Sequence, residues 1–195
     1  MTTKFSKKPH ALGLFFREGI KRFKVHGSLL PSSRYLSRKI LKQVEMREGI
    51  FIVELGAGTG AFTNMILSEM PKTGKLVIFE INPILVKHLR DSIIDSRVII
   101  IEADAVDIAG HLRNLNLTKP DYIISGIPIG NFSKSMRNSL LMAIHGSLSD
   151  TGLFIQFQYF LSSLISVKKL FDAKIIGYEC RNLPPAFIYG CRKKV

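Results

Sequence analysis

The feature that most constrains the fold of this chain is a glycine-rich turn between an apolar run and an amphipathic segment. Residues 54–60 read Glu-Leu-Gly-Ala-Gly-Thr-Gly, after an expected strand over 50–55 and before an expected helix over 61–70. Glycine adopts positive φ and lets the backbone approach a ligand closely, and a helix N-terminus offers unpaired N–H groups. In this context the turn predicts a nucleotide-binding loop on a Rossmann-like α/β fold.

The chain beyond the turn alternates apolar runs typical of buried strands with amphipathic runs typical of helices. Repeated β-α units predict a parallel sheet with helices on both faces. The last two strands are close enough in sequence to be antiparallel neighbours, and we expect one domain over residues 48–195. The expected strands span residues 50–55, 75–80, 97–102, 121–125, 153–158, 174–180 and 186–191, and the helices after the turn span 61–70, 83–92, 107–115, 133–147 and 161–171.

Acidic residues follow the second and third expected strands. Glu80 lies about 20 residues beyond the glycines, where a carboxylate can accept both hydroxyls of a ribose. Asn82 is the expected cap of the next helix. Asp104 is expected to accept from the amino group of adenine, and the alternative is that it only caps a helix.

These motifs together resemble the class I S-adenosylmethionine (SAM)-dependent methyltransferases over about residues 50–192. The resemblance implies a seven-stranded, mostly parallel sheet with an antiparallel last strand, and SAM bound across the first two loops. The alternative cofactor is NAD, whose fingerprint places a glycine at position 61; this chain has Ala61, a substitution that many such sites tolerate, so the spacing only favours SAM. The predicted cofactor residues are Glu54, Gly56, Ala57, Gly58, Gly60, Glu80, Asn82, Asp104, Ala105, Ser125 and Gly126.

The substrate loop is expected after the fourth strand, where residues 125–132 read Ser-Gly-Ile-Pro-Ile-Gly-Asn-Phe. The loop has a more distant similarity to the rRNA adenine dimethyltransferases, whose Asn-Leu-Pro-Tyr/Phe binds the adenine amino group and stacks on the extruded base. This chain has Ser125 and Ile129 at the Asn and aromatic positions, and Phe132 stands at a different spacing. RNA adenine N6-methylation is therefore the alternative function rather than the favoured one.

Five segments spread along the chain are similar to the small bacterial phospholipid N-methyltransferases, which convert phosphatidylethanolamine stepwise to phosphatidylcholine. This resemblance implies SAM-dependent N-methylation of phosphatidylethanolamine at a membrane surface. Tyr159 is a candidate to orient the amine, and the rings of Tyr35, Phe132 and Tyr159 are candidates to stabilise the growing cation. No spacing typical of a metal site is present. The similar segments are residues 27–33, 79–83, 125–128 with 131–132, 156–159 and 182–186.

The positive charge of the chain is concentrated at its start. Residues 1–47 hold twelve Lys/Arg and two Glu and so contribute +10 of the net charge of +13. Amphipathic helices are expected over residues 10–24 and 33–46, and the first carries the apolar run Leu14-Phe15-Phe16. Such an arm favours an anionic lipid surface over nucleic acid, and we expect it to bind the membrane and cover the cofactor. The alternative is that its apolar face packs on the domain.

The location expected for the protein is the cytoplasm, with peripheral attachment to the inner face of the cytoplasmic membrane. The longest apolar run, residues 153–167, is shorter than the roughly 20 residues that span a bilayer. The N-terminus lacks the pattern of a secretory signal. Cys180 and Cys191 show no redox or metal spacing, which favours a reducing compartment.

Overall fold

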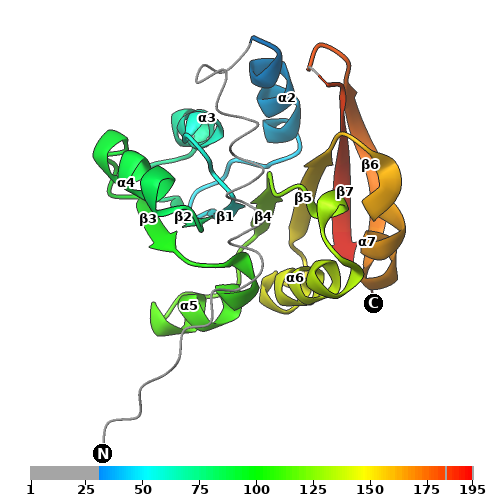
Figure 1. The fold of residues 1–195 in the computed structure, drawn as a ribbon. Helices are drawn as coiled ribbons and strands as arrows, with labels where there is room; N and C mark the ends of the chain where they lie inside the picture. The colour runs from blue at the N-terminus through cyan, green and yellow to red at the C-terminus, as the bar shows by residue number, and fades with distance from the viewer. Residues whose placement is uncertain (1–30, 183, 195) are drawn as a thin grey trace, which may run out of the picture.

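The residues that the structure describes form one seven-stranded sheet with helices on both faces (Figure 1). The computed structural model describes residues 31–182 and 184–194. The strand order is β3-β2-β1-β4-β5-β7-β6, and β7 is antiparallel to both β5 and β6 whereas the other pairs are parallel. The predicted fold class is confirmed. The strands are β1 (Phe51–Leu55), β2 (Lys75–Glu80), β3 (Val98–Glu102), β4 (Tyr122–Ser125), β5 (Leu153–Gln158), β6 (Phe171–Glu179) and β7 (Ala186–Lys193).

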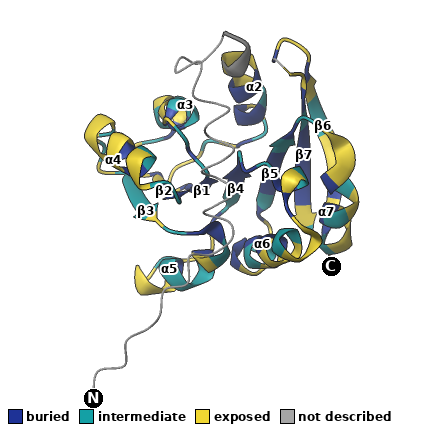
Figure 2. Ribbon diagram, in the orientation of Figure 1, coloured by how far each residue is buried: buried dark blue, intermediate teal, exposed yellow. Residues whose placement is uncertain are grey.

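Two apolar layers separate the sheet from its helices. Helices α2, α3 and α4 pack on one face, and α5, α6 and α7 pack on the other (Figure 1). All five residues of β1 are buried, which is why this strand is a continuous apolar run broken only by Glu54 (Figure 2). The helices are α2 (Pro31–Leu41), α3 (Ala61–Glu69), α4 (Pro83–Ser92), α5 (Ile108–Asn114), α6 (Lys134–Ser147) and α7 (Leu164–Leu170), with short 3-10 turns η1 (Ala105–Asp107), η2 (Ile129–Asn131) and η3 (Leu161–Ser163).

Several element boundaries differ from the sequence-based expectation, among them the end of α2 and the start of β6. Helix α2 ends at Leu41 instead of near residue 46, because the chain turns there and buries Val44 in the core. Strand β6 begins at Phe171, three residues earlier than expected, directly where α7 ends. Phe171 and Ala173 are buried on one face while the residues between and after them are exposed, which is the two-residue period of a strand.

The described part of the basic arm packs against the sheet. Leu36 and Ile40 of α2 are buried in the core. The ammonium group of Lys39 lies 3.2 Å from the carboxylate of Glu179 at the end of β6, so an ion pair also holds α2 in place. The amphipathic helix expected over residues 10–24 lies outside the described residues.

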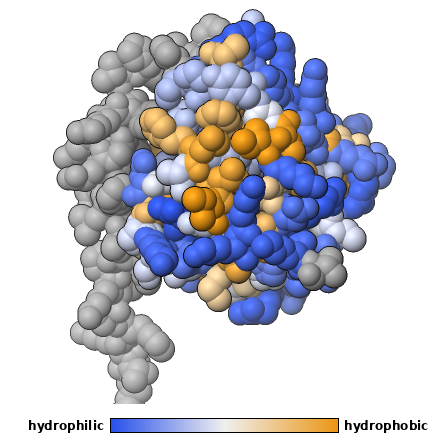
Figure 3. All heavy atoms as spheres, turned by 90° about the vertical axis from the view of Figure 1, so that its right-hand side faces the viewer, coloured by the Kyte–Doolittle hydropathy of each residue, from blue (hydrophilic) through white to orange (hydrophobic). Residues whose placement is uncertain are grey.

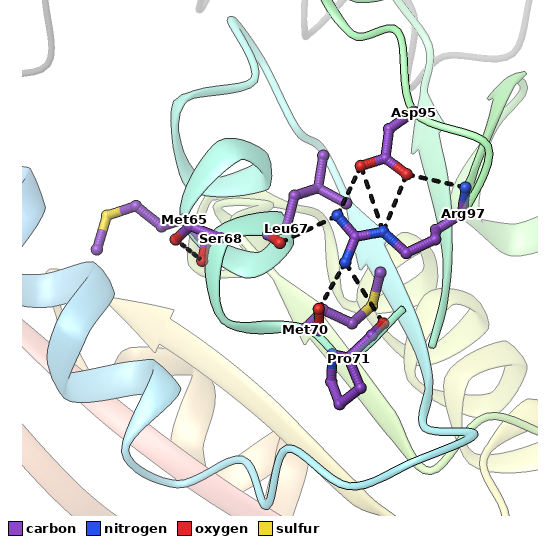
Figure 4. A network of polar contacts seen from close by, with 7 residues as sticks. All are labelled: Met65, Leu67, Ser68, Met70, Pro71, Asp95 and Arg97. Atoms are coloured by element: carbon purple, nitrogen blue, oxygen red, sulfur yellow. Dashed lines mark hydrogen bonds and ion pairs between the residues drawn. The ribbon is translucent and has the colours of Figure 1, made fainter. Parts of the chain in front are cut away.

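A side chain from outside α3 closes the C-terminal end of that helix (Figure 4). The last carbonyls of a helix lack partners within the helix, and α3 has no basic residue in its own last turn. The guanidinium of Arg97 donates to the carbonyls of Leu67 at 3.1 Å and Met70 at 2.5 Å. Asp95 holds that guanidinium through an ion pair of 2.6 Å. The start of β3 is thereby fixed to the end of α3.

Replacing Arg97 with methionine is expected to lower the free energy of unfolding by about 2 kcal/mol, because the α3 carbonyls and Asp95 lose a charged donor. Urea denaturation measures this change. The matched control is Lys87→Met, which removes an exposed ion pair with Asp91 of equal length, 2.6 Å, and should cost less than about 0.5 kcal/mol. Equal losses of unfolding free energy in the two variants would show that the Arg97 contacts stabilise the fold no more than an exposed ion pair does.

No helix among the described residues is long and apolar enough to cross a membrane. Both cysteines are free thiols, Cys180 at the surface and Cys191 in the core. Within the described ranges, no group of three or more His, Cys, Asp or Glu side chains is arranged to hold a metal ion.

Candidate functional site

The turn between β1 and α3 adopts the left-handed backbone conformation at three glycines. The φ angles of Gly56, Gly58 and Gly60 are 75°, 61° and 79°, values that residues with a side chain rarely adopt. The N–H of Gly56 donates to the carbonyl of Phe79 at 2.8 Å, which ties the turn to the end of β2. A Cβ on Gly58 would meet no atom within 4 Å, so the backbone here borders open space. The predicted cofactor turn therefore lies at the carboxyl ends of β1 and β2.

The carboxylate of Glu80 organises this turn from the end of β2. It is buried, and it accepts the N–H of Gly58 at 3.1 Å and the N–H of Asn82 at 2.9 Å. Burial raises the pKa of Glu80, and the bonds from Asn82 and Gly58 lower it in part. A carboxylate has about four lone-pair positions, so two backbone bonds leave room for ribose hydroxyls.

A pocket opens where the first three strands end. Two acids lie in its wall, and the side chains between them are apolar, a combination that fits the hydroxyls, the amino group and the flat ring of an adenosine. Four of the predicted cofactor residues meet here, namely Gly56, Glu80, Asp104 and Ala105. The pocket is lined by Gly56, Phe79, Glu80, Ile81, Ala103, Asp104, Ala105 and Ile127.

Asn82 and Asp104 each cap a helical turn beside the pocket. The side-chain oxygen of Asn82 accepts the N–H of Ile84 at 2.9 Å at the start of α4, which confirms the expected cap. Asp104 accepts the N–H of Val106 at 3.1 Å at the start of η1. The capping alternative for Asp104 is thus what the structure shows, and since Asp104 also lines the pocket, its contact with adenine stays a prediction.

Three predicted cofactor residues support the turn without lining the pocket. Glu54 is buried behind the turn, where its carboxylate accepts the hydroxyl of Thr63 at 2.7 Å. Burial raises the pKa of Glu54 to about 7; the bond from Thr63 lowers the pKa, and the nearby charge of Glu80 raises it. Ala57 packs in the core layer of α2, α3 and α4, and Gly60 precedes α3.

Two glutamines of β5 tie down the loop after β4, residues 125–132, which we call the acceptor loop. The side-chain nitrogens of Gln156 and Gln158 both donate to the carbonyl of Ile127, at 3.0 and 2.9 Å. The side-chain oxygen of Gln158 accepts the N–H of Gly130 at 3.3 Å. Sequence reasoning missed this role. The available signal was a pair of polar residues two positions apart on an otherwise apolar strand.

Most other residues of the acceptor loop are buried or partly buried, and Asn131 is exposed. Ser125 is fully buried, and its hydroxyl accepts a backbone N–H within the loop at 3.2 Å. Gly126 lies beside the glycine turn, since a Cβ there would come within 3.4 Å of the carbonyl of Gly56. Phe132 is buried in the core, which corrects its candidacy as an aromatic that faces the substrate. Its ring contributes to packing instead.

The two tyrosines predicted to act on the amine occupy different surroundings. Tyr159 directly follows β5 and is half-buried; burial raises the pKa of its phenol, and a bond with Asn182 lowers it. The raised pKa keeps the phenol in its neutral form at physiological pH. Tyr35 lies on α2 with the guanidinium of Arg181 above its ring, 3.7 Å from the centroid. The catalytic roles of both residues stay predictions.

The sheet order, the glycine turn and the acids after β2 and β3 define a class I SAM-dependent methyltransferase. The chain belongs to the family described as ribosomal RNA adenine dimethylase, whose model matches residues 25–159. SAM is accordingly the cofactor of this protein.

Several known proteins are similar to this chain. An ornithine lipid N-methyltransferase from Singulisphaera acidiphila is 30% identical over 189 residues, which cover 93% of each chain. A precorrin-6y C5,15-methyltransferase from Geobacter metallireducens shares the fold with a TM-score of 0.64 at 16% identity, over 87% of this chain and 92% of the other. A SAM-dependent O-methyltransferase from Thermotoga maritima also reaches 0.64 at 16% identity, over 91% and 71%.

Proposed function

We propose that this chain transfers the methyl group of SAM to the primary amine of a membrane lipid, with phosphatidylethanolamine as the substrate that the sequence resemblance implies. The observation that carries the proposal is the make-up of the acceptor loop. Ser125 occupies the place of the asparagine that grips adenine, and Ile129 and Phe132 are both buried. Neither position therefore offers an exposed aromatic ring on which a flipped adenine could stack.

The similarity to the Singulisphaera acidiphila enzyme supports a lipid amine as the methyl acceptor. Its name assigns it N-methylation of an ornithine lipid. Ornithine and ethanolamine headgroups both present a primary amine, so the same chemistry serves either substrate. An ornithine lipid is therefore tested beside phosphatidylethanolamine.

The chain's own residues have mainly a positioning task in this reaction. Bound SAM supplies an electrophilic methyl group that already carries its leaving group. Glu80 and the glycine turn would hold the ribose, and the acceptor loop would place the amine beside them, since Gly126 adjoins Gly56. The ammonium headgroup would first lose a proton to water, and the neutral phenol of Tyr159 would then accept a remaining N–H and aim the nitrogen lone pair at the methyl group. The nitrogen–carbon bond would form as the bond between that methyl group and sulfur breaks, with the electron pair left on sulfur.

RNA adenine N6-methylation is the second candidate, favoured by the description of the family and by the basic arm over residues 1–47. The same arm suits the first candidate, because clustered Lys and Arg also bind anionic lipid headgroups. On the lipid proposal, the protein works peripherally at the inner face of the cytoplasmic membrane.

The deciding experiment follows the labelled methyl group. The full chain is incubated with labelled SAM and, separately, with vesicles that contain phosphatidylethanolamine, vesicles that contain an ornithine lipid, and RNA. We expect label in the lipid fraction as mono- and dimethylated headgroups, and none in RNA above the level of a Glu80→Ala control. Label in RNA with none in either lipid would refute the proposal and establish the second candidate.

A further inference from the structure

Apolar side chains gather at the surface over η3, α7 and β6. Figure 3 shows them as one patch with hydrophilic residues around it, on the face that carries α7 and β6. Phe160 and Ile165 are 71% and 74% exposed, and Leu161 and Ile175 are exposed as well. We call these four residues the docking patch. Exposed apolar clusters on a soluble domain are typical of interaction surfaces.

The backbone of the docking patch is held in place while its side chains face outward. The buried hydroxyl of Tyr189 donates to the carbonyl of Phe160 at 3.1 Å, so this residue is anchored although its ring is exposed. On β6, Phe171 and Ala173 face the core beneath α7. The two-residue period of the strand brings Ile175 to the same face, beyond the part that α7 covers.

Positive charge borders the docking patch. Lys168 and Lys169 follow Ile165 by three and four residues, so all three side chains share the exposed face of α7, whereas Val167 is buried on the opposite face. Neither lysine forms an ion pair with a carboxylate among the described residues. An apolar surface edged by unpaired lysines complements an anionic lipid interface, where acyl chains lie beneath negative headgroups.

The docking patch adjoins the acceptor loop. Phe160 comes two residues after Gln158, whose side chain holds that loop. The turn η3, which contains Leu161, packs against η2 of the acceptor loop. A surface that rests on a bilayer through these residues would therefore bring the acceptor loop to the level of the headgroups.

We infer that the docking patch inserts into the surface of an anionic membrane and orients the acceptor loop toward lipid headgroups. This inference rests on the proposed lipid substrate and adds the surface through which the folded domain meets it. The lysines of α7 contact the negative headgroups, and Phe160, Leu161, Ile165 and Ile175 contact the upper acyl chains.

The wild-type chain contains no tryptophan, so a single introduced tryptophan reports membrane contact at the chosen position alone. In the full-length Phe160→Trp variant, vesicles of phosphatidylglycerol and phosphatidylethanolamine should shift the emission to the blue by about 10 nm, and brominated acyl chains should quench it. The matched control is Ile94→Trp, at a position 96% exposed between α4 and β3, which should show neither change. An unshifted Phe160→Trp spectrum would overturn the inference, whether or not the protein sediments with the vesicles.

Charge substitution tests the same surface by affinity. Phe160→Asp with Ile165→Asp should reduce partitioning onto these vesicles at least about tenfold, while Ile94→Asp with Leu115→Asp should not. SAM titration confirms that both variants fold. If the docking-patch variant partitions like the wild type, the inference fails; if it also turns a dimer into a monomer in light scattering, the patch is a subunit interface instead.

Separate assays distinguish failure of the membrane-contact inference from failure of the proposed methyl transfer. Vesicle binding is measured without SAM, and methyl transfer is measured on a short-chain, water-soluble lipid amine that needs no membrane. Methyl transfer to that amine without insertion of the tryptophan would refute only the inference that the docking patch contacts the membrane. Insertion of the tryptophan without methyl transfer to any lipid amine would refute only the proposed function.

Discussion

Replacing Glu80 with alanine is expected to weaken SAM binding about 100-fold. The variant loses a charged acceptor for two ribose hydroxyls, and each such bond is worth about 1.5 kcal/mol. It also leaves the N–H groups of Gly58 and Asn82 without their shared partner, so the glycine turn loses its fixed shape. Isothermal titration with SAM measures the change in affinity.

The matched control for this prediction is Glu102→Ala. Glu102 lies beside Glu80 in the parallel register of β2 and β3, but it is exposed and does not line the pocket. Its removal should leave the SAM affinity within about twofold, as expected for a surface substitution away from the site. If Glu80→Ala keeps wild-type affinity, the ribose does not bind at this carboxylate.

Replacing Glu54 with glutamine is expected to make the protein more stable at pH 8 and to change its stability much less at pH 5. The pKa of Glu54 is raised from 4.5 to about 7 in the folded state. The folded protein therefore binds this proton more tightly than the unfolded chain, and stability falls as the pH rises from about 4.5 to above 7. Glutamine mimics the protonated form and can still accept from Thr63, so the variant escapes a loss of about 3 kcal/mol at pH 8.

Urea unfolding of both proteins at pH 5 and pH 8 measures this difference. Glu102→Gln serves as the control, because it makes the same chemical change at an exposed position. Parallel pH dependences for wild type and Glu54→Gln would mean that the carboxylate stays ionised in the folded state. The conclusion that burial and the nearby charge of Glu80 raise the pKa of Glu54 would then be wrong.

The strand positions and the glycine turn were predictable because local pattern determines them. Apolar runs of five or six residues that are followed by Gly56 or end at Glu80 are typical of buried strands followed by a turn. The positive φ angles at Gly56, Gly58 and Gly60 follow from the same motif. The antiparallel pairing of β6 and β7 follows from their short connection.

The features that sequence reasoning missed depend on contacts between distant residues. Arg97 reaches the end of α3 only because β3 lies beside β2 in the sheet, and nothing near Arg97 in sequence signals this. Gln156 and Gln158 reach the acceptor loop only through the pairing of β4 with β5. Phe132 could be assigned to the core only after the position of η2 was known.

The carbonyl of Ile127 accepts hydrogen bonds from both Gln156 and Gln158, and this affects how a substrate is selected. The acceptor loop is tied to β5 by hydrogen bonds within the folded chain, so it forms a rigid template rather than a flap that closes over the substrate. Little conformational entropy is lost when an amine arrives, and affinity for a lipid headgroup then depends on how well it matches a shape already fixed by folding.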